Sequence, residues 1–196
     1  MCGIVGYIGK NNAQEAILQG LEKLEYRGYD SAGIAIVDDG VMKSEKFKGR
    51  LSVLSDYLEQ NPISGNLGIG HTRWATHGAP SDENSHPHLN NDNTIAVVHN
   101  GIIENYVALK EELIAKGYTF KSQTDTEVIV HLLDSIYEGN LLEAVNKLTT
   151  IIRGAYALGV ICSKNPNEMV AVRNESPLIV GLGKNENFIA SDIPAL

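Results

Sequence analysis

Residues 32–47 read AGIAIVDDGVMKSEKF, and this stretch decides the class of fold. Two β-rich runs, 32–38 and 41–47, flank the tripeptide Asp38-Asp39-Gly40. Because Asp-Gly favours a tight hairpin turn with positive φ, we expect two antiparallel strands here. Further short runs of the same kind predict strands at 3–9, 67–72, 94–99, 155–162, 167–173, 177–182 and 187–190.

Helical periodicity separates these strands. The clearest case is 12–25, where Ala13, Ile17 and Leu21 share one face. Strands linked by hairpins and interrupted by helices predict an α+β fold in which helices cover antiparallel sheets. The remaining predicted helices are 50–60, 105–116, 125–138 and 141–149. Gly117 ends the helix at 105–116, and Gly139 ends the helix at 125–138.

Length and charge restrict the class of protein. A chain of 196 residues is long enough for one domain with a sizeable core. The net charge of −8 argues against nucleic acid or an anionic membrane as partner, since both require a basic face. No apolar run approaches the ~20 residues of a membrane span, and signal-peptide features are absent, so we expect a cytoplasmic protein. The abrupt end at 192–196, without a helix cap or polar tail, leads us to expect a missing partner domain.

Cys2 directly follows Met1 and precedes an apolar run. Because cysteine is a small residue, we expect Met1 to be removed, which leaves a thiol and a free α-amine on one residue. An α-amine has a pKa of about 7.7–8.0, so it can act as the base for the thiol. The alternative is that Cys2 is an ordinary small hydrophobe. Cys162 lies in an apolar run and is expected to be inert core, and two cysteines are too few for a disulfide framework.

Two polar segments flank predicted strands. Residues 24–34, LEYRGYDSAGI, form an elbow between helix and strand that by itself indicates a glycine-containing turn. Residues 70–78, GHTRWATHG, run from a strand into the long polar stretch 75–93. Arginine there can hold a carboxylate bidentately, although an exposed Arg-Trp pair on the surface is equally consistent. We interpret 75–93 as a mobile active-site loop, since long polar loops in compact domains are usually functional or disordered.

The segment 97–105, VVHNGIIEN, places Asn100 and Gly101 at the predicted end of a strand. This dipeptide is most often a turn. An asparagine amide beside a glycine N–H is also a workable oxyanion hole.

The segment 122–127, SQTDTE, lies at a predicted helix start. Thr124 or Asp125 is expected to cap this helix, and Glu127 completes a capping box if Thr124 is the cap. Capping alone explains these residues.

Five histidines lie close together in the sequence, and His86-Pro87-His88 raises the question of a metal site. No helical pair of histidines four residues apart and no accompanying set of cysteines supports one, so no metal is expected. The five are His71, His77, His86, His88 and His99.

Taken together, five ordered motifs resemble one family, the class II glutamine amidotransferases, whose glutaminase domain is an N-terminal-nucleophile hydrolase. The resemblance runs from Cys2 to Asp192. Two of the motifs are similar to those of the branch that makes an amino sugar from fructose 6-phosphate, whereas members of purine or asparagine synthesis carry different versions. The motifs are CGIVG at 2–6, YRGYDSAG at 26–33, HTRWATHG at 71–78, HNGIIEN at 99–105 and TDTE at 124–127.

This resemblance implies a four-layer α-β-β-α sandwich of two antiparallel sheets, formed by residues 1–196 as a single domain with Cys2 at the end of a central strand. It implies L-glutamine as substrate and no metal or organic cofactor. It also implies a longer enzyme, usually a homodimer, whose absent sugar-isomerase half binds fructose 6-phosphate and receives the ammonia to make glucosamine 6-phosphate.

The resemblance assigns catalytic roles to three residues. Cys2 is the nucleophile and its freed α-amine the general base, while the Asn100 side chain and the Gly101 N–H form the oxyanion hole. Arg73 is assigned to the α-carboxylate of glutamine and Asp125 to its α-ammonium group.

Five further positions receive supporting roles from the same resemblance. Thr76 and His77 complete the glutamine pocket. Trp74 lies on the loop that closes over glutamine and helps to gate ammonia passage. Arg27 lies near the nucleophile and the route to the partner domain, and His86 orders the loop.

Three alternatives stay open at this point. The chain is the glutaminase domain of another class II amidotransferase, or another N-terminal-nucleophile amidohydrolase for which glutamine is a poor substrate and Arg73→Ala has little effect. The third is a catalytically silent glutamine-binding module, which retention of Met1 would favour because the α-amine would no longer belong to Cys2.

Overall fold

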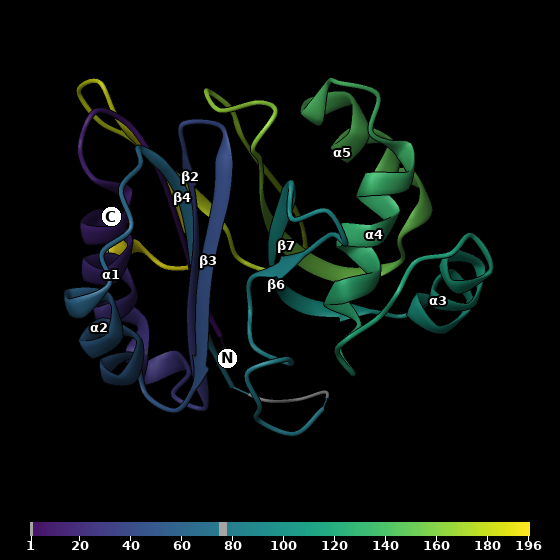
Figure 1. Cartoon of the computed structure of the whole chain (residues 1–196), viewed down its shortest axis with the longest axis horizontal. Coiled ribbons are helices and arrows are strands. Elements are labelled where there is room, and N and C mark those ends of the chain that lie inside the picture. The colour runs from purple at the N-terminus through teal and green to yellow at the C-terminus, as the bar shows by residue number, and fades with distance from the viewer. Residues whose placement is uncertain (1, 75–77) are drawn as a thin grey trace.

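The computed structural model describes residues 2–74 and 78–196 and contains four layers in the order α-β-β-α (Figure 1). The first sheet has six antiparallel strands in the order β3-β2-β4-β1-β10-β9. The strand that follows Cys2 therefore lies inside this sheet, with a neighbour on each side. The strands are β1 (Gly3–Ile8), β2 (Ser31–Asp38), β3 (Val41–Lys48), β4 (Leu67–Arg73), β9 (Ile179–Leu182) and β10 (Asn187–Ala190).

The second sheet has four antiparallel strands in the order β5-β6-β7-β8. Its strands are β5 (His88–Leu89), β6 (Ile95–Ile103), β7 (Gly154–Cys162) and β8 (Met169–Asn174). Two helices cover the outer face of the first sheet and three lie beside the second (Figure 1). They are α1 (Ala13–Leu24) and α2 (Leu51–Gln60), then α3 (Tyr106–Ala115), α4 (Thr126–Ile136) and α5 (Leu141–Ile151), with short 3-10 turns at Glu25–Arg27 and Ile193–Ala195.

Each pair of adjacent layers encloses its own apolar core. Ile17 and Leu21 of α1 pack on the first sheet, Val98 and Ile161 meet its inner face, and α4 packs on the far side of the second sheet. Because both faces of the central strands are covered, all seven residues of β4 are buried. Gly70 lets α1 approach this strand closely, since a Cβ there would collide with Ile17. The predicted α+β class is thereby confirmed.

The predicted hairpin at 38–40 is confirmed in detail. Asp39 has φ of 48° and Gly40 has φ of 77°, so both central residues of the turn are left-handed. The two strands pair without interruption from Asp38 opposite Val41 to Ser31 opposite Lys48. The other predicted strands and helices lie within a few residues of their predicted positions, and β5 is an additional two-residue strand.

The predicted strand end at Asn100 is wrong. β6 continues through Asn100 and Gly101 to Ile103, and these two residues pair with Ala157 and Tyr156 of β7. Gly101 has φ of 129°, and a Cβ at this position would collide with the carbonyl oxygen of Ala155. Glycine is therefore required here for a positive φ within a strand rather than for a turn.

Helix lengths also bear on membrane insertion. None of the helices in the described part of the chain has the length and apolar character needed to cross a bilayer.

Candidate active site

A pocket of about 290 Å³ opens where the end of β1 meets β4 and β6. Its size is near the lower end for small-molecule sites, which are roughly 300–1,000 Å³, so it suits a ligand about as large as an amino acid. Every predicted site residue that the structure describes lines it. These residues are Cys2, Arg27, Arg73, Trp74, His86, Asn100, Gly101 and Asp125. The predictions for Thr76 and His77 lie outside the described residues.

Strand pairing brings Cys2 to the pocket. β1 and β4 run antiparallel with Gly3 opposite Thr72, so Cys2 lies beside the end of β4. The backbone N–H of Trp74 donates to the Cys2 sulfur at 3.1 Å. The sulfur is also 3.5 Å from the Trp74 carbonyl oxygen, to which the thiol donates.

The thiol of Cys2 is not activated by its surroundings alone. Burial raises its pKa above the ordinary value, and the Trp74 N–H and the charges of Arg73 and Arg27 oppose this effect only in part. Because the thiolate is the nucleophilic form of cysteine, this thiol requires a base in order to react.

Asn100 connects the two sheets at the pocket floor. Its amide nitrogen donates to the backbone oxygen of Cys2 at 3.0 Å. Its amide oxygen lies 3.0 Å from Nε2 of His71. An asparagine amide carries two N–H donors, so one of them is still available to a ligand beside Cys2.

Two opposite charges line the same pocket. Arg73 ends β4, and one of its guanidinium nitrogens donates to the Gly78 carbonyl oxygen at 3.5 Å. Burial lowers the pKa of Arg73, and the carboxylates of Asp30 and Asp125 counteract the shift. A buried guanidinium and a buried carboxylate on one pocket can bind a ligand that carries both charges.

The predicted position of the helix cap is correct for Asp125, but the expected capping hydrogen bond does not form. Asp125 occupies the N-cap position of α4, but its side chain makes no capping hydrogen bond and accepts instead from the Ile103 N–H at 2.8 Å. Glu127 accepts from the N–H groups of Lys121 and Ser122, so no capping box forms with Thr124. The reason is tertiary, because β6 offers Asp125 a donor that no local pattern reveals.

Arg27 enters the pocket wall from the turn after α1. Its guanidinium lies 2.9 Å from the Asp192 carboxylate and 3.4 Å from the Ser191 carbonyl oxygen. The Tyr26 hydroxyl donates to the same carboxylate at 2.6 Å. The hydrogen bonds from Tyr26 and Ile193 and the Arg27 charge hold the pKa of Asp192 below its ordinary value.

Four buried histidines underlie this region. The rings of His71 and His86 stack with centroids 4.2 Å apart, and His88 meets His86 edge-on at 4.8 Å. Burial lowers the pKa of His71 to about 3 and holds those of His86 and His88 well below the ordinary value, so these rings are neutral at neutral pH. Of these four histidines, only His86 was given a role from the sequence. A polar residue at a buried position of a strand was the available signal for His71 and His99.

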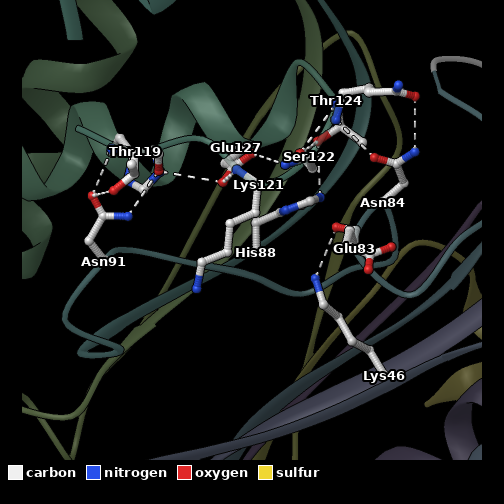
Figure 2. Close-up of polar contacts among 12 residues, drawn as sticks. Lys46, Glu83, Asn84, His88, Asn91, Thr119, Lys121, Ser122, Thr124 and Glu127 are labelled. Carbon is white, nitrogen blue, oxygen red and sulfur yellow. Dashed lines mark hydrogen bonds and ion pairs between the residues drawn. The ribbon is translucent and has the colours of Figure 1, made fainter. Parts of the chain in front are cut away.

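The stretch 75–93 was predicted to be a mobile active-site loop; within it, residues 84–88 are buried and His88–Leu89 form β5. Figure 2 shows how side chains hold this segment. Asn84 accepts from the Gln123 N–H at 2.9 Å, and His88 lies 3.0 Å from the Thr124 hydroxyl. Lys46 of β3 donates to the carbonyl oxygens of Glu83 and Ser85 at 3.3 and 2.8 Å.

Two pocket residues had no signal in the sequence. Ser176 and Pro177 lie between β8 and β9 and reach the pocket only through the packing of the two sheets. Within residues 2–74 and 78–196, no three His, Cys, Asp or Glu side chains are grouped so that they could hold a metal ion.

Comparison with known families decides the relationship. Residues 71–196 match the model of the glutamine amidotransferase domain family. This chain is a member of that family. The resemblance predicted from the sequence motifs is thereby confirmed.

Curated relatives of this amidotransferase domain are much longer. The chain is 63% identical over all its 196 residues to glutamine--fructose-6-phosphate aminotransferase (isomerizing) of Clostridium perfringens, and 56% identical to that of Thermus thermophilus. It covers 32% of each of these proteins, so it spans about a third of their length.

Solved structures confirm the four-layer sandwich. The amidotransferase domain superposes on glutamine phosphoribosylpyrophosphate amidotransferase from B. subtilis with a TM-score of 0.86 and 28% identity, covering 99% of this chain and 42% of that one. A class II glutamine aminotransferase domain protein from Silicibacter pomeroyi shares the fold at a TM-score of 0.56 and 15% identity, over 96% of this chain and 88% of that chain.

Proposed function

We propose that this domain hydrolyses L-glutamine to glutamate and ammonia through a thioester on Cys2. The observation that carries the proposal is the convergence on one pocket of a cysteine thiol, the Asn100 amide and two opposite charges, Arg73 and Asp125. Membership of the glutamine amidotransferase domain family supports the same substrate.

Glutamine is a zwitterion that carries a neutral amide, so its recognition needs both signs of charge. We assign the α-carboxylate to Arg73 and the α-ammonium group to Asp125. Both side chains are buried, and charge-assisted hydrogen bonds are stronger there than in water. With the two charges held, the side-chain amide of glutamine extends towards Cys2.

The reaction requires a base, since burial raises the pKa of the Cys2 thiol. The α-amine of Cys2 fills this role once Met1 is removed, with a pKa of about 7.7–8.0. The sulfur attacks Cδ of glutamine while the amine takes the thiol proton. The Asn100 amide and the Gly101 N–H stabilise the tetrahedral oxyanion.

Collapse of this intermediate completes the first half of the cycle. The C–N bond breaks, the ammonium form of the α-amine returns its proton to the leaving nitrogen, and ammonia departs. Water, deprotonated by the α-amine, then attacks the γ-glutamyl thioester. The thiolate leaves and is reprotonated, so that glutamate is released and Cys2 is restored. No step in this cycle uses a metal or an organic cofactor.

Supporting roles follow from the positions of the remaining residues. Trp74 is 44% exposed at the pocket mouth and is assigned to the loop that closes over glutamine. Arg27 is assigned to the route by which ammonia leaves, and His86 to holding the loop, since its ring accepts from the His99 N–H at 3.3 Å. The glutamine contacts of Thr76 and His77 remain predictions.

The acceptor of the ammonia is proposed to bind to further domains of a longer protein. The relatives are named for fructose 6-phosphate, and the chain spans about a third of their length. We therefore propose that residues 1–196 act with sugar-isomerase domains that receive the ammonia and form glucosamine 6-phosphate, in a cytoplasmic homodimer. The net charge of −8 supports a small-molecule acceptor rather than nucleic acid.

The test is glutamate release by the full-length protein and by its Cys2→Ala variant, after the intact mass has shown whether Met1 is absent. Glutamate release by the wild type but not by Cys2→Ala supports the proposal. If glucosamine 6-phosphate then forms when fructose 6-phosphate is added, fructose 6-phosphate is the acceptor. Absence of release from protein without Met1 refutes the glutaminase. Binding of glutamine without release, in protein that retains Met1, identifies the silent form.

A further inference from the structure

His71 lies fully buried in β4, directly behind the Asn100 side chain. Its Nε2 atom is 3.1 Å from the backbone oxygen of His99 and 3.0 Å from the amide oxygen of Asn100. Its Nδ1 atom has no hydrogen-bond partner among the described residues. All the hydrogen bonding of this ring is therefore concentrated on one nitrogen.

The carbonyl oxygen of His99 determines where the ring proton lies. A carbonyl oxygen only accepts, so Nε2 of His71 must carry the hydrogen that both contacts share. Burial keeps the ring neutral, with a pKa of about 3, so Nδ1 carries no hydrogen. The backbone thereby selects the tautomer of His71 independently of the orientation of any side-chain amide.

This tautomer in turn fixes the orientation of Asn100. An N–H group that points at the amide must face its oxygen, because the NH₂ end would set donor against donor. The NH₂ end then faces Cys2 and donates to its backbone oxygen at 3.0 Å. A reversed amide would place two oxygens against each other and present an acceptor where the oxyanion develops.

We propose that His71 is a positioning residue that keeps the NH₂ end of the Asn100 amide turned towards the nucleophile. The inference rests on the proposed glutaminase function, since it assigns His71 a part in the oxyanion hole. The His71 ring borders the pocket, and its hydrogen bond to the Asn100 amide is the contact through which it acts. Its stacking on His86, at 4.2 Å, holds the plane of the ring in which the N–H points.

Two amide substitutions separate this role from simple packing. The amide nitrogen of His71→Gln reaches the position of Nε2, whereas that of His71→Asn is one methylene shorter and falls near Nδ1. We expect His71→Asn to lower kcat for glutamate release by at least about tenfold, towards the 10²–10³ that loss of an oxyanion donor costs. We expect KM for glutamine to change less than threefold, and His71→Gln to recover most of kcat.

A double-mutant cycle with Asn100→Ala provides the decisive readout. If His71 acts through Asn100, His71→Asn lowers kcat no further once the amide is gone. His88 is buried to a similar degree and makes no contact with Asn100, so His88→Asn is the control for loss of a buried imidazole. We expect His88→Asn to lower the melting temperature. Any loss of kcat that it causes should add to the loss caused by Asn100→Ala.

The experiment uses the full-length protein with Met1 removed, and folding of each variant is checked by thermal melting. Equal kcat for wild type and His71→Asn, or full additivity with Asn100→Ala, overturns the inference while leaving the glutaminase intact. Absence of glutamate release from the wild type overturns the proposed function and this inference together. If His71→Asn does not fold, His71→Leu, which is close to histidine in volume and carries no donor, enters the same cycle.

Discussion

The side-chain amide nitrogen of Asn100 lies 3.0 Å from the backbone oxygen of Cys2, although 98 positions separate the two residues. Cys2 precedes a strand of the six-stranded sheet, and Asn100 belongs to the four-stranded sheet. The site is therefore assembled by the packing of one sheet on the other. The distance between nucleophile and amide therefore depends on how the apolar layer between the sheets packs.

Removal of the Asn100 amide tests the oxyanion hole directly. We expect Asn100→Ala to lower kcat for glutamate release by about 10²–10³, because one donor to the developing negative charge is lost. The KM for glutamine should stay near the wild-type value, since the proposed contacts of Arg73 and Asp125 with the substrate are unchanged. Steady-state kinetics of glutamate release measure both quantities, and a kcat close to wild type would exclude the assignment.

The two cysteines should differ sharply towards iodoacetamide. Cys2 lines the pocket, whereas Cys162 is fully buried in β7, so native protein should take up one equivalent, on Cys2. Loss of glutamate release should follow this label, and glutamine should slow it. Peptide mass spectrometry locates the label, and a Cys162→Ala variant is the control. Labelled protein that keeps its activity would rule out Cys2 as the nucleophile.

The role of Asp125 can be separated from general damage by shortening the substrate. We expect Asp125→Asn to raise KM for glutamine roughly 10- to 100-fold, as one charge-assisted hydrogen bond is worth about 1.5–3 kcal/mol. Glutaric acid monoamide lacks the α-ammonium group, so wild type and variant should handle it equally. A variant that is impaired to the same extent on both substrates would show that Asp125 supports the fold instead.

The crowded backbone at Gly101 predicts a large difference between two glycine substitutions. Gly101 has positive φ and no room for a Cβ, whereas Gly117 has φ of 94° and open space around it. Gly117→Ala should lower the free energy of unfolding by about 1 kcal/mol, the cost of a left-handed alanine. Gly101→Ala should cost clearly more, because it adds the collision with Ala155. Urea denaturation measures both, and equal losses would contradict the close approach of Gly101 to Ala155.

Acid should destabilise the fold at a pH well above the range in which carboxylates titrate. His71 has a pKa of about 3 in the folded chain and about 6.5 when unfolded, so the unfolded state takes up the proton first. The free energy of unfolding then falls as pH drops below 6.5, by about 2 kcal/mol at pH 5 for this residue. Urea denaturation at pH 7 and pH 5 measures the loss, and His71→Gln should reduce it. An unchanged pH dependence in that variant would show that His71 titrates normally.

Sequence reasoning succeeded where the signal was local. The hairpin at Asp39 and Gly40 follows from the φ values that these residues tolerate, and α1 follows from its apolar periodicity. It failed where a distant segment decides the conformation. The Asn-Gly pair stays within a strand because β7 pairs along its whole length. The Asp125 side chain, at the N-cap of α4, bonds to the Ile103 N–H instead of to its own helix.

Prediction of the site residues likewise succeeded for local signals and failed for contacts between distant segments. The residues that bear reactive or charged groups were predicted from the motifs that contain them. His71 was not, because its part depends on a hydrogen bond to a backbone oxygen 28 positions away. Ser176 and Pro177 were missed for a related reason, since no property of the segment between β8 and β9 indicates that it lies at the pocket.

The position of β1 between β4 and β10 determines how late in translation this strand can complete its pairing. Val5 pairs with Ala190, and Ile4 exchanges hydrogen bonds with Ser191, so one edge of the first strand stays open until these late residues have emerged from the ribosome. Pairings this distant in sequence form slowly and late. The residue that is translated almost first is thus among the last to be held in place, and the proposed site is incomplete in a nascent chain until the rest of the domain exists.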